Sequence, residues 1–462
     1  MSRRVGAAYV CVLVLLLPGL ALWAGAVHDA AAAPVQSTSG QSRSAMEAQR
    51  EALFQRMLDN PADLDAAFAY AAISSKLGDF EGAITALERM LIFAPDLARV
   101  QLELGVLYYR LGAYATSRDY FQKAVSGDNV PDEVRASVAR YLAEISSNEK
   151  RNKFSGSAFA GVKYQTNANA GPASSQININ GITFTLNNES LKQGDGNAFF
   201  AASLHYDYDL QRQGDLLETD VLFYGAKFLS QGRLDAAVLE VTFGPSFNMQ
   251  RFSIRNSQLG IYGIGNVVGL DDNLYFGSAG AGMRLVSRPG IGNVVRLKTE
   301  LRRKWYHNSS ARPTADYRDG NEFSGEMSFS TAVGSGVKLH GKARVVREDV
   351  RADWYDNWQM GGEAGVGVSI APLIKDSKLF TSFWLFDVTG GYRHVRYDSP
   401  DAAILATEKQ RNDEYFIRTS LTVPVGTALA VVPQLEYRRV KSNYDIYAYK
   451  NLSATLGLAM RF

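Results

Sequence analysis

From residue 154 to its end, the chain alternates between apolar and polar residues with a period of two, and this pattern restricts the fold most. Successive side chains of a β-strand point to opposite faces, so each such segment predicts a strand with one apolar face. In the last segment that face carries Leu452, Ala454, Leu456, Leu458, Met460 and Phe462. Strands are expected to begin near Phe154, Asn197, Leu216, Leu234, Gln258, Leu274, Gly292, Glu322, Val337, Trp358, Phe380, Asp413, Thr427 and Lys450.

Fourteen segments in the 309 residues from 154 to 462 leave about 22 residues for each strand and its connection. That length suits a strand that crosses a bilayer together with its loop. No backbone group can stay unpaired in hydrocarbon, so strands that cross a bilayer must close into a barrel. Only alternate residues then face lipid, which explains the low mean hydropathy. We predict a transmembrane antiparallel β-barrel of about 14 strands over 154–462; a large secreted β-domain is the alternative.

Aromatic and polar residues are distributed as a membrane barrel requires. Long polar stretches at 167–197, 308–321 and 398–412 predict surface loops that alternate with tighter periplasmic turns. The final strand, which ends on Phe462, resembles the strand that outer-membrane proteins present to the barrel-assembly machinery, so that machinery and outer-membrane lipid are expected partners. Aromatic residues that could form two interfacial girdles are Phe199, Phe200, Trp305, Tyr306, Trp354, Tyr355, Phe383, Trp384 and Phe386.

Charged residues alternate with the apolar ones and should therefore point into the barrel. The basic positions expected to line the lumen are Arg296, Lys298, Arg302, Lys304, Lys338, Lys342 and Arg344. The same alternation directs inward Glu300, His340, Glu218, Asp220, Glu436 and Arg438. These side chains could form ion pairs that fill the barrel, or they could select what passes through it.

A helical pattern that repeats with a fixed period precedes the strands, from about 44 to 150. Gly78, Phe80, Ala83, Leu87, Leu91 and Pro95 are matched 34 positions later by Gly112, Tyr114, Ser117, Phe121, Val125 and Asn129. This period is typical of tetratricopeptide repeats, in which each unit is a pair of antiparallel helices. We therefore predict a multidomain α and β protein, with a repeat domain at 44–150 and a capping helix at 131–147; a generic helical-hairpin array is the alternative.

Repeats of this kind bind peptides in the groove formed by their first helices. The register places in that groove Asp65, Phe68, Ala72, Ser75, Lys76, Arg99, Leu102, Val106, Tyr109 and Arg110. We take as candidate client-binding residues Asp65, Phe68, Ser75, Lys76, Arg99, Leu102, Tyr109 and Arg110. Each could equally be a packing residue.

The segment 1–33 has the layout of a secretory signal peptide. A positive start (Arg3, Arg4) precedes an almost wholly apolar run to Trp23, and small residues follow. The lone cysteine, Cys11, lies inside this segment, so the mature chain would contain no cysteine. Disulfides are therefore not expected, even in an oxidising compartment.

Composition excludes several classes of protein. With 46% hydrophobic and 21% charged residues the chain can bury enough surface to fold. The 49 basic and 47 acidic residues nearly cancel, so no nucleic-acid partner is expected. The five histidines have no metal-ligand spacing, and we find no nucleophile elbow and no phosphate-binding loop. We expect no catalytic residue, metal or cofactor.

A secreted chain with a short repeat array and a C-terminal barrel resembles the surface lipoprotein assembly modulators (the Slam family). The stretch Tyr164-Gln165-Thr166-Asn167-Ala168-Asn169-Ala170 also looks like the barrel entry of that family. The resemblance implies a periplasmic repeat domain that receives a client, and an outer-membrane barrel that helps lipoproteins, or in some members soluble proteins, to reach the cell surface. It carries over no catalytic residue.

Two other functions remain open for this architecture. Barrels with tetratricopeptide scaffolds also export polysaccharides, usually with many more repeats and with acidic and aromatic residues in the lumen. The basic clusters at 296–304 and 338–344 favour the protein translocator over that alternative. A passive porin-like protein, whose repeats bind a periplasmic partner, is a third possibility.

Overall fold

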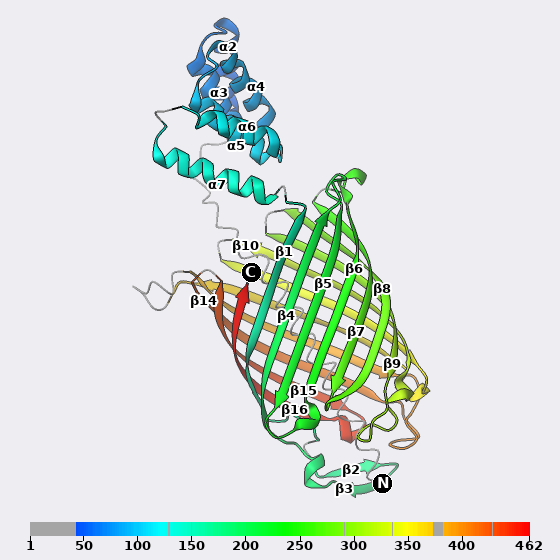
Figure 1. Cartoon of the computed structure of the whole chain (residues 1–462). Helices are drawn as coiled ribbons and strands as arrows, with labels where there is room; N and C mark the ends of the chain where they lie inside the picture. The colour runs from blue at the N-terminus through cyan, green and yellow to red at the C-terminus, as the bar shows by residue number, and fades with distance from the viewer. Residues whose placement is uncertain are drawn as a thin grey trace. The chain divides into compact units, whose positions relative to one another are not determined.

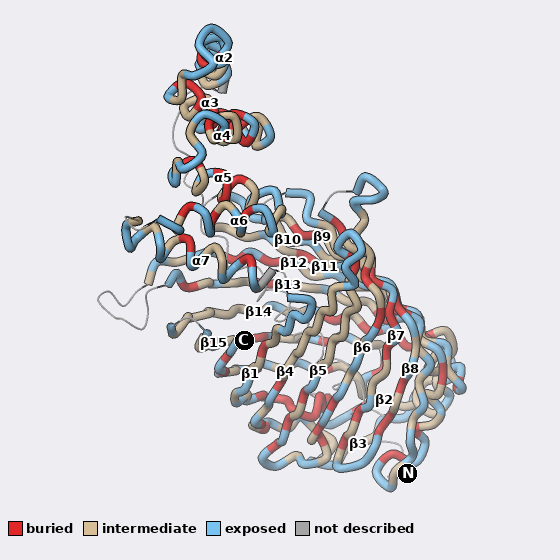
Figure 2. The backbone as a smooth tube through the Cα atoms, turned by 45° about the horizontal axis from the view of Figure 1, so that its top comes forward, coloured by how far each residue is buried: buried red, intermediate tan, exposed pale blue. Residues whose placement is uncertain are grey.

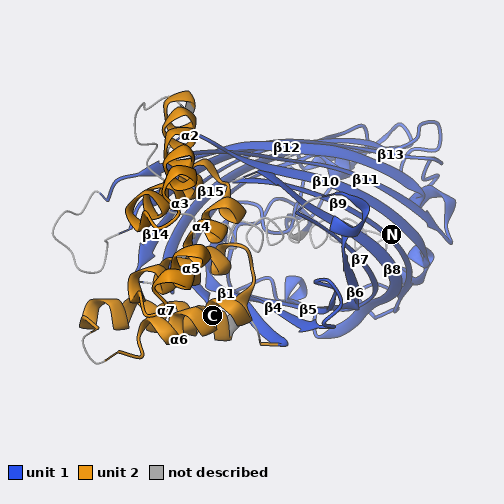
Figure 3. Cartoon of the chain, turned by 90° about the horizontal axis from the view of Figure 1, so that it is seen from above, with its two compact units in different colours: residues 1–34, 151–462 blue, residues 35–150 orange. Residues whose placement is uncertain are grey.

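The computed structural model describes residues 43–127, 130–148, 150–172, 174–254, 256–290, 292–334, 336–372, 382–426 and 428–462. The expected signal peptide at 1–33 lies outside these residues. The described residues fall into two compact units, one within Val35–Lys150 and the other spanning Arg151–Phe462 (Figure 3).

The first unit is helical and follows the predicted repeat. Its helices α3 and α4 form one antiparallel pair, and α5 and α6 form the next pair, one repeat further along the chain. None of the helices in the described ranges is both long and apolar enough to cross a membrane. The bounds are α2 (Arg43–Asp59), α3 (Leu64–Leu77), α4 (Phe80–Phe93), α5 (Ala98–Arg110), α6 (Tyr114–Ala124) and α7 (Asp132–Asn148).

Local chemistry explains where these helices begin and end. Asp63 and Asp79 cap α3 and α4, because each carboxylate accepts a hydrogen bond from a free backbone N–H of the first turn. Gly78 (φ +87°) and Gly112 (φ +76°) follow α3 and α5 in the left-handed conformation that glycine adopts without steric cost. Each glycine therefore ends the first helix of its repeat pair.

Small residues allow the paired helices to pack closely. The hydroxyl of the fully buried Ser117 on α6 donates to the carbonyl of Gly105 on α5 at 2.7 Å. A Cβ at Gly105 would lie 2.6 Å from the ring of Phe121, so only glycine fits there. Ala83 takes the corresponding buried position in the first pair, as the repeat predicts.

The second unit is a closed antiparallel barrel of fourteen strands, which confirms the predicted fold (Figure 1). Strands β1 and β16 close it, with Gly161 opposite Gly457. The strands are β1 (Asn152–Gln165), β4 (Asp195–Asp209), β5 (Leu216–Phe228), β6 (Ala236–Asn248), β7 (Ser257–Leu270), β8 (Asn273–Gly290), β9 (Asn293–Tyr306), β10 (Gly320–Val333), β11 (Val337–Val350), β12 (Asn357–Ile370), β13 (Trp384–Tyr397), β14 (Arg411–Val425), β15 (Leu429–Ser442) and β16 (Tyr449–Arg461).

Most strands begin within a few residues of the expected positions. Leu234 was expected to start a strand but lies in the short 3₁₀ turn η3 (Gly232–Leu234), and β6 begins at Ala236. The expected starts at Phe380 and Thr427 lie outside the described residues. The strands that follow them, β13 and β15, begin at Trp384 and Leu429.

The barrel wall exposes apolar side chains on its outside, and burial alternates along the strands (Figure 2). Leu301, Leu435 and Leu458 are 64%, 55% and 59% exposed, which would be costly in water but suits a wall in contact with lipid. A closed barrel with this outer face fits an outer-membrane protein.

The expected aromatic girdles need a correction. Adjacent aromatic residues on a strand point to opposite faces, so one member of a strand pair cannot contact lipid. Trp354 and Tyr355 lie off the strands, in the 3₁₀ turn η6 (Asp353–Tyr355). Phe200 is exposed on the outer wall, whereas Phe199 packs inward against Phe159 with ring centroids 5.1 Å apart. Trp305 is likewise exposed outside, while Tyr306 packs among Tyr275 and Phe276.

The two ends of the barrel differ. The end where β1 begins and β16 ends, here called the first end, has connections such as 210–215 and 249–256. The opposite, second end carries the longest connection, 166–194, together with 307–319 and 398–410, whereas the connection between β12 and β13 at the first end spans 371–383. The first of these contains a hairpin of β2 (Gln176–Ile179) and β3 (Ile182–Thr185), seen beyond the barrel strands in Figure 1.

Candidate functional site

Ion pairs between strands that are not neighbours identify the interior face of the barrel. Arg302 on β9 donates to Glu240 on β6 at 2.7 Å, although β7 and β8 lie between them in the sheet. Arg284 on β8 reaches Glu218 (2.5 Å) and Asp220 (3.1 Å) on β5 in the same way. Side chains three strands apart can meet only on the concave side of a curved sheet, so these residues point into the lumen.

The basic residues of β9 are compensated by acids. The buried carboxylate of Glu300 lies 2.7 Å from Lys298 and 2.6 Å from Arg302. Lys304 pairs with Glu322 on β10 and with Glu348 on β11. Arg296 lies on the same face of the strand by alternation.

The basic residues of β11 follow the same arrangement. Lys342 lies 3.0 Å from Glu363 on β12, and His340 lies 2.8 Å from Asp387 on β13. Lys338 and Arg344 share this face of the strand, and the Arg344 side chain is exposed.

A third network joins β13, β14 and β15. Glu414 contacts both Arg393 and Arg438, and Glu436 lies 2.8 Å from Arg418 and 2.8 Å from Arg438. The sequence predicts Glu436 and Arg438 in the lumen, and the structure adds Glu414, Arg393 and Arg418 to that face. Their alternation was visible in the sequence, but nothing in it indicated which strands they would join.

The lumen is therefore a network of paired charges, not a basic surface. Sequence reasoning identified the cations of β9 and β11 but missed the acids that neutralise them, such as Glu240, Glu363 and Asp387. These acids are distant from their partners along the chain and meet them only when the barrel closes.

In the helical unit, part of the expected groove is open. Arg99 is exposed, and its guanidinium lies 4.7 Å from the centre of the Phe68 ring, so the two form a cation–π pair between α3 and α5. Asp65 and Lys76 are also exposed on α3, and Ser75 is half-buried. Arg110 lies 5.9 Å from the centre of the Phe80 ring.

Two other expected groove residues instead pack against helix α7. Leu102 and Tyr109 belong to the hydrophobic cluster around Phe121, Val138 and Ile145. The Tyr109 hydroxyl donates to Glu144 at 2.7 Å, and this hydrogen bond raises the pKa of Tyr109 to about 12. The ring of Tyr109 also meets that of Tyr141, with centroids 5.3 Å apart.

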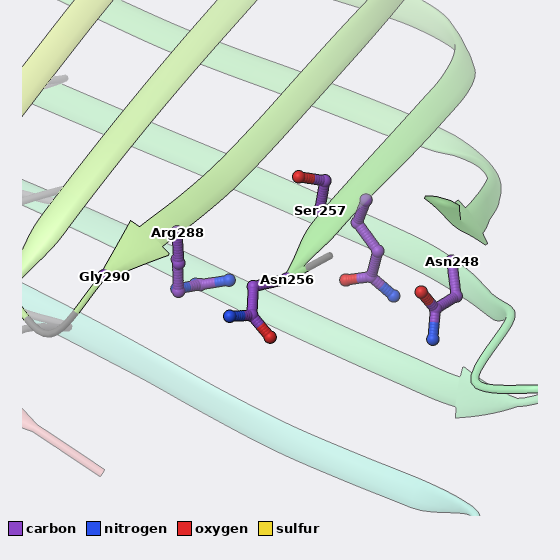
Figure 4. Close-up of a pocket in the computed structure, with 6 residues that line it drawn as sticks. Asn248, Asn256, Ser257, Arg288 and Gly290 are labelled. Atoms are coloured by element: carbon purple, nitrogen blue, oxygen red, sulfur yellow. The ribbon is translucent and has the colours of Figure 1, made fainter. Parts of the chain in front are cut away.

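A polar pocket of about 570 Å³ lies at the first end of the barrel, where β6, β7 and β8 meet their turns (Figure 4). The hydroxyl of Ser257, which lines it, donates to Ser287 at 2.8 Å. The pocket is lined by Asn248, Asn256, Ser257, Gln258, Arg288 and Gly290.

In the described ranges, no three His, Cys, Asp or Glu side chains are placed to hold a metal ion.

No protein-family model matches the chain, and no curated protein matches its sequence. Solved structures that resemble part of it include the Yersinia enterocolitica type III secretion chaperone SycD in complex with a peptide of the translocator YopD. That match has 13% identity, covers 23% of this chain and 82% of that one, and has a TM-score of 0.22.

Two further solved structures give similar values. The match to the complex of the TPR2B domain of yeast Sti1 with pHsp70 has 16% identity, covers 23% of this chain and 88% of that one, and has a TM-score of 0.21. The match to MamA has 12% identity, covers 23% of this chain and 62% of that one, and has a TM-score of 0.21. TM-scores this low assign neither a family nor a function to this chain.

Proposed function

We propose that this protein is an outer-membrane translocation factor, whose periplasmic repeat unit receives a client protein and whose barrel aids transfer of that client to the cell surface. The observation that carries the proposal is a tetratricopeptide-like unit followed within a few residues by a closed barrel with an apolar outside and a charged inside. The resemblance of this layout to the Slam family supports a surface lipoprotein as the client.

The barrel topology supports an orientation in which the repeat unit lies in the periplasm. The helical unit is joined to β1 at the first end, and the last strand ends there too. Outer-membrane barrels have shorter turns on the periplasmic side and longer loops outside. The longest connection, 166–194, lies at the second end, and the other second-end loops 307–319 and 398–410 are no longer than 371–383 at the first end. With the helical unit joined to the first end, we place the first end in the periplasm and the second end, with its hairpin of β2 and β3, in the medium.

The lumen favours a protein client over a polysaccharide. A sugar chain that slides through a pore needs aromatic rings with accessible faces. On β5, β7 and β8 the interior rings of Tyr224, Tyr262 and Phe276 are only 7–8% exposed. The Tyr262 hydroxyl donates to Glu300, so this ring belongs to the ion-pair network. In the helical unit, by contrast, Phe68 and Arg99 offer a mixed apolar and cationic surface to a peptide.

Protease shaving of intact cells tests the proposal. We compare cells that carry the full chain, cells that lack the gene, and cells with residues 44–150 deleted but the barrel inserted. At least one lipoprotein is expected to lose protease accessibility in both mutants while its total amount stays unchanged. Unchanged surface exposure of every lipoprotein would contradict the proposal, and a fall in secreted polysaccharide alone would favour the export porin.

A further inference from the structure

Five cations gather on the outer face of the barrel near its second end. They alternate along their strands with interior residues such as Arg393, Glu414 and Arg438, so they point away from the lumen. All five side chains are exposed. We call them the outer cationic patch: Arg396 on β13, Arg411 on β14, Arg439 and Lys441 on β15, and Lys450 on β16.

The sheet register sets like charges against each other in this patch. Arg396 lies directly opposite Arg411, and Arg439 lies directly opposite Lys450. Such residues have Cβ atoms about 4.5–5.5 Å apart, and like charges at that spacing destabilise a sheet. An anion bound between them would remove this repulsion.

Few acids offset the patch. Asp413 lies opposite Lys441, but its carboxylate already accepts from the Tyr392 hydroxyl at 2.6 Å and lies 2.9 Å from His394. Arg411 lies 3.9 Å from Glu408. Within the ranges that the structure describes, Arg396, Arg439 and Lys450 have no ion-pair partner.

Elsewhere at the second end, several cations have an acidic partner. Lys227 lies 2.9 Å from Asp235, Arg351 lies 2.7 Å from Asp316, and Arg347 pairs with Asp398. In the described part of the chain, Arg303 on β9 has only the amide oxygen of Asn321 nearby, at 3.5 Å. The patch on β13–β16 differs from these cations because its members stand directly opposite one another.

The patch lies next to the lipid-facing wall. On the same outer face, Tyr415 lies directly opposite Arg439 in the register. The rings of Tyr392 and Tyr415 lie 5.1 Å apart, and the Lys441 ammonium lies 5.5 Å from the Tyr415 ring centre. Leu435 and Leu452, which follow toward the middle of the wall, are 55% and 49% exposed. Tyrosines in this position mark the bilayer interface, so the cations are at the depth of lipid head groups.

We infer that the outer cationic patch binds the phosphorylated sugar head group of lipid A, the glycolipid of the outer leaflet. Guanidinium groups bind phosphate through paired hydrogen bonds, and the apolar wall below the patch can accommodate acyl chains. The choice of leaflet rests on the orientation given under the proposed function, whereas the site itself is independent of any client.

Lipid binding to the purified full-length protein tests this inference. The protein is stripped of lipid in detergent and then offered bis-phosphorylated lipid A, dephosphorylated lipid A or phosphatidylglycerol. Bound lipid is measured by native mass spectrometry. We expect at least tenfold more bis-phosphorylated lipid A to be retained than either other lipid. Retention of dephosphorylated lipid A, or of phosphatidylglycerol, equal to that of bis-phosphorylated lipid A would overturn the inference. Both comparisons use the wild-type protein.

Charge variants then locate the site. R396Q/R411Q/R439Q/K450Q should lose at least tenfold in lipid A retention. The matched control K227Q/R303Q/R347Q/R351Q removes four cations from the rest of the rim and should stay within twofold of the wild type. Heat-modifiable migration on gels verifies folding, and the milder R439Q/K450Q variant replaces the quadruple one if that fails to fold. Retention at the wild-type level in the folded patch variant would overturn the inference, whatever the outcome for surface display.

Discussion

Arg302 on β9 and Glu240 on β6 form an ion pair with 2.7 Å between Nη1 and Oε2, across the two strands that separate them in the sheet. The same guanidinium lies 2.6 Å from the buried carboxylate of Glu300. Contacts of this kind fix the curvature of the wall as well as its charge, because they exist only while the strands stay closed around the lumen. They also leave few free charges on β9.

Removing Glu300 should destabilise the barrel. The change Glu300→Ala leaves Lys298 without its carboxylate partner and deprives Arg302 of one of its two carboxylate partners. Breaking a buried ion pair costs about 3 kcal/mol. We expect a loss of that order in the free energy of unfolding, measured by urea titration of the protein in liposomes. Glu326→Ala is the control, because Glu326 has no ion pair among the described residues. Equal stability of the two variants would show that the network contributes nothing.

The β1–β16 seam should not accept a side chain at Gly161. A Cβ there would meet the carbonyl oxygen of Leu456 and lie 2.7 Å from the Cα of Gly457. Gly161→Ala is therefore expected to cost about 1–3 kcal/mol and to lower the fraction of folded, heat-modifiable barrel. Gly263→Ala is the matched control, since a Cβ at Gly263 has only the Phe243 oxygen within 4 Å, at 3.9 Å. A seam variant that folds as well as the control would rule out close packing at this point.

The loop 166–194 is anchored by a buried asparagine. Asn169 donates to the Leu191 carbonyl at 2.7 Å and accepts from the Gln193 N–H at 2.9 Å. Asn169→Ala leaves both backbone groups without a hydrogen-bond partner, which costs about 1–3 kcal/mol of local stability. The Gln193 amide should therefore exchange hydrogen at least about tenfold faster. Asn188→Ala, at an exposed position in the same loop, should leave exchange unchanged. The same rate at Gln193 in both variants would contradict the anchoring role.

Alkaline pH should weaken the helical unit through Tyr109. Its hydrogen bond to Glu144 raises the pKa from the ordinary 10.0 to about 12, so the folded state favours the protonated hydroxyl. This contribution to stability is complete below pH 10 and is lost as the pH rises from 10 to about 12. The core clusters of this unit contain only its own side chains, so the isolated fragment 43–150 can be used.

Thermal unfolding of that fragment followed by circular dichroism gives the measurement. Between pH 9 and pH 12 the midpoint of Tyr109→Phe should fall less than that of the wild type, because phenylalanine has no proton to lose. Parallel curves for the two proteins would mean that the hydrogen bond to Glu144 does not contribute.

Sequence patterns predicted the features that depend on neighbours along the chain. The repeat period matched Gly78 with Gly112, and both have positive φ after the first helix of a pair. Alternation predicted fourteen strands, because each strand needs one face for lipid and one for the lumen. Helix ends and strand faces are local properties, so a single sequence is enough to locate them.

Features that depend on closure could not be predicted. The carboxylates of Glu240 and Asp387 meet their partners only across intervening strands. Nothing local distinguishes Asn169 as an anchor, because its partners lie 22 and 24 residues away. The groove register could not show that Tyr109 packs against α7, because that contact depends on how the capping helix docks.

Transfer of a client from the repeat unit to the barrel can be followed by site-specific photo-cross-linking in living cells. The photoreactive residue replaces Arg99 in the groove, Arg344 on the interior face of the barrel, Asp119 on α6 or Leu301 on the outer wall. We expect one lipoprotein to cross-link at both Arg99 and Arg344, and at neither Asp119 nor Leu301. The absence of any lipoprotein adduct at Arg99 and Arg344, or adducts at all four positions alike, would contradict that transfer.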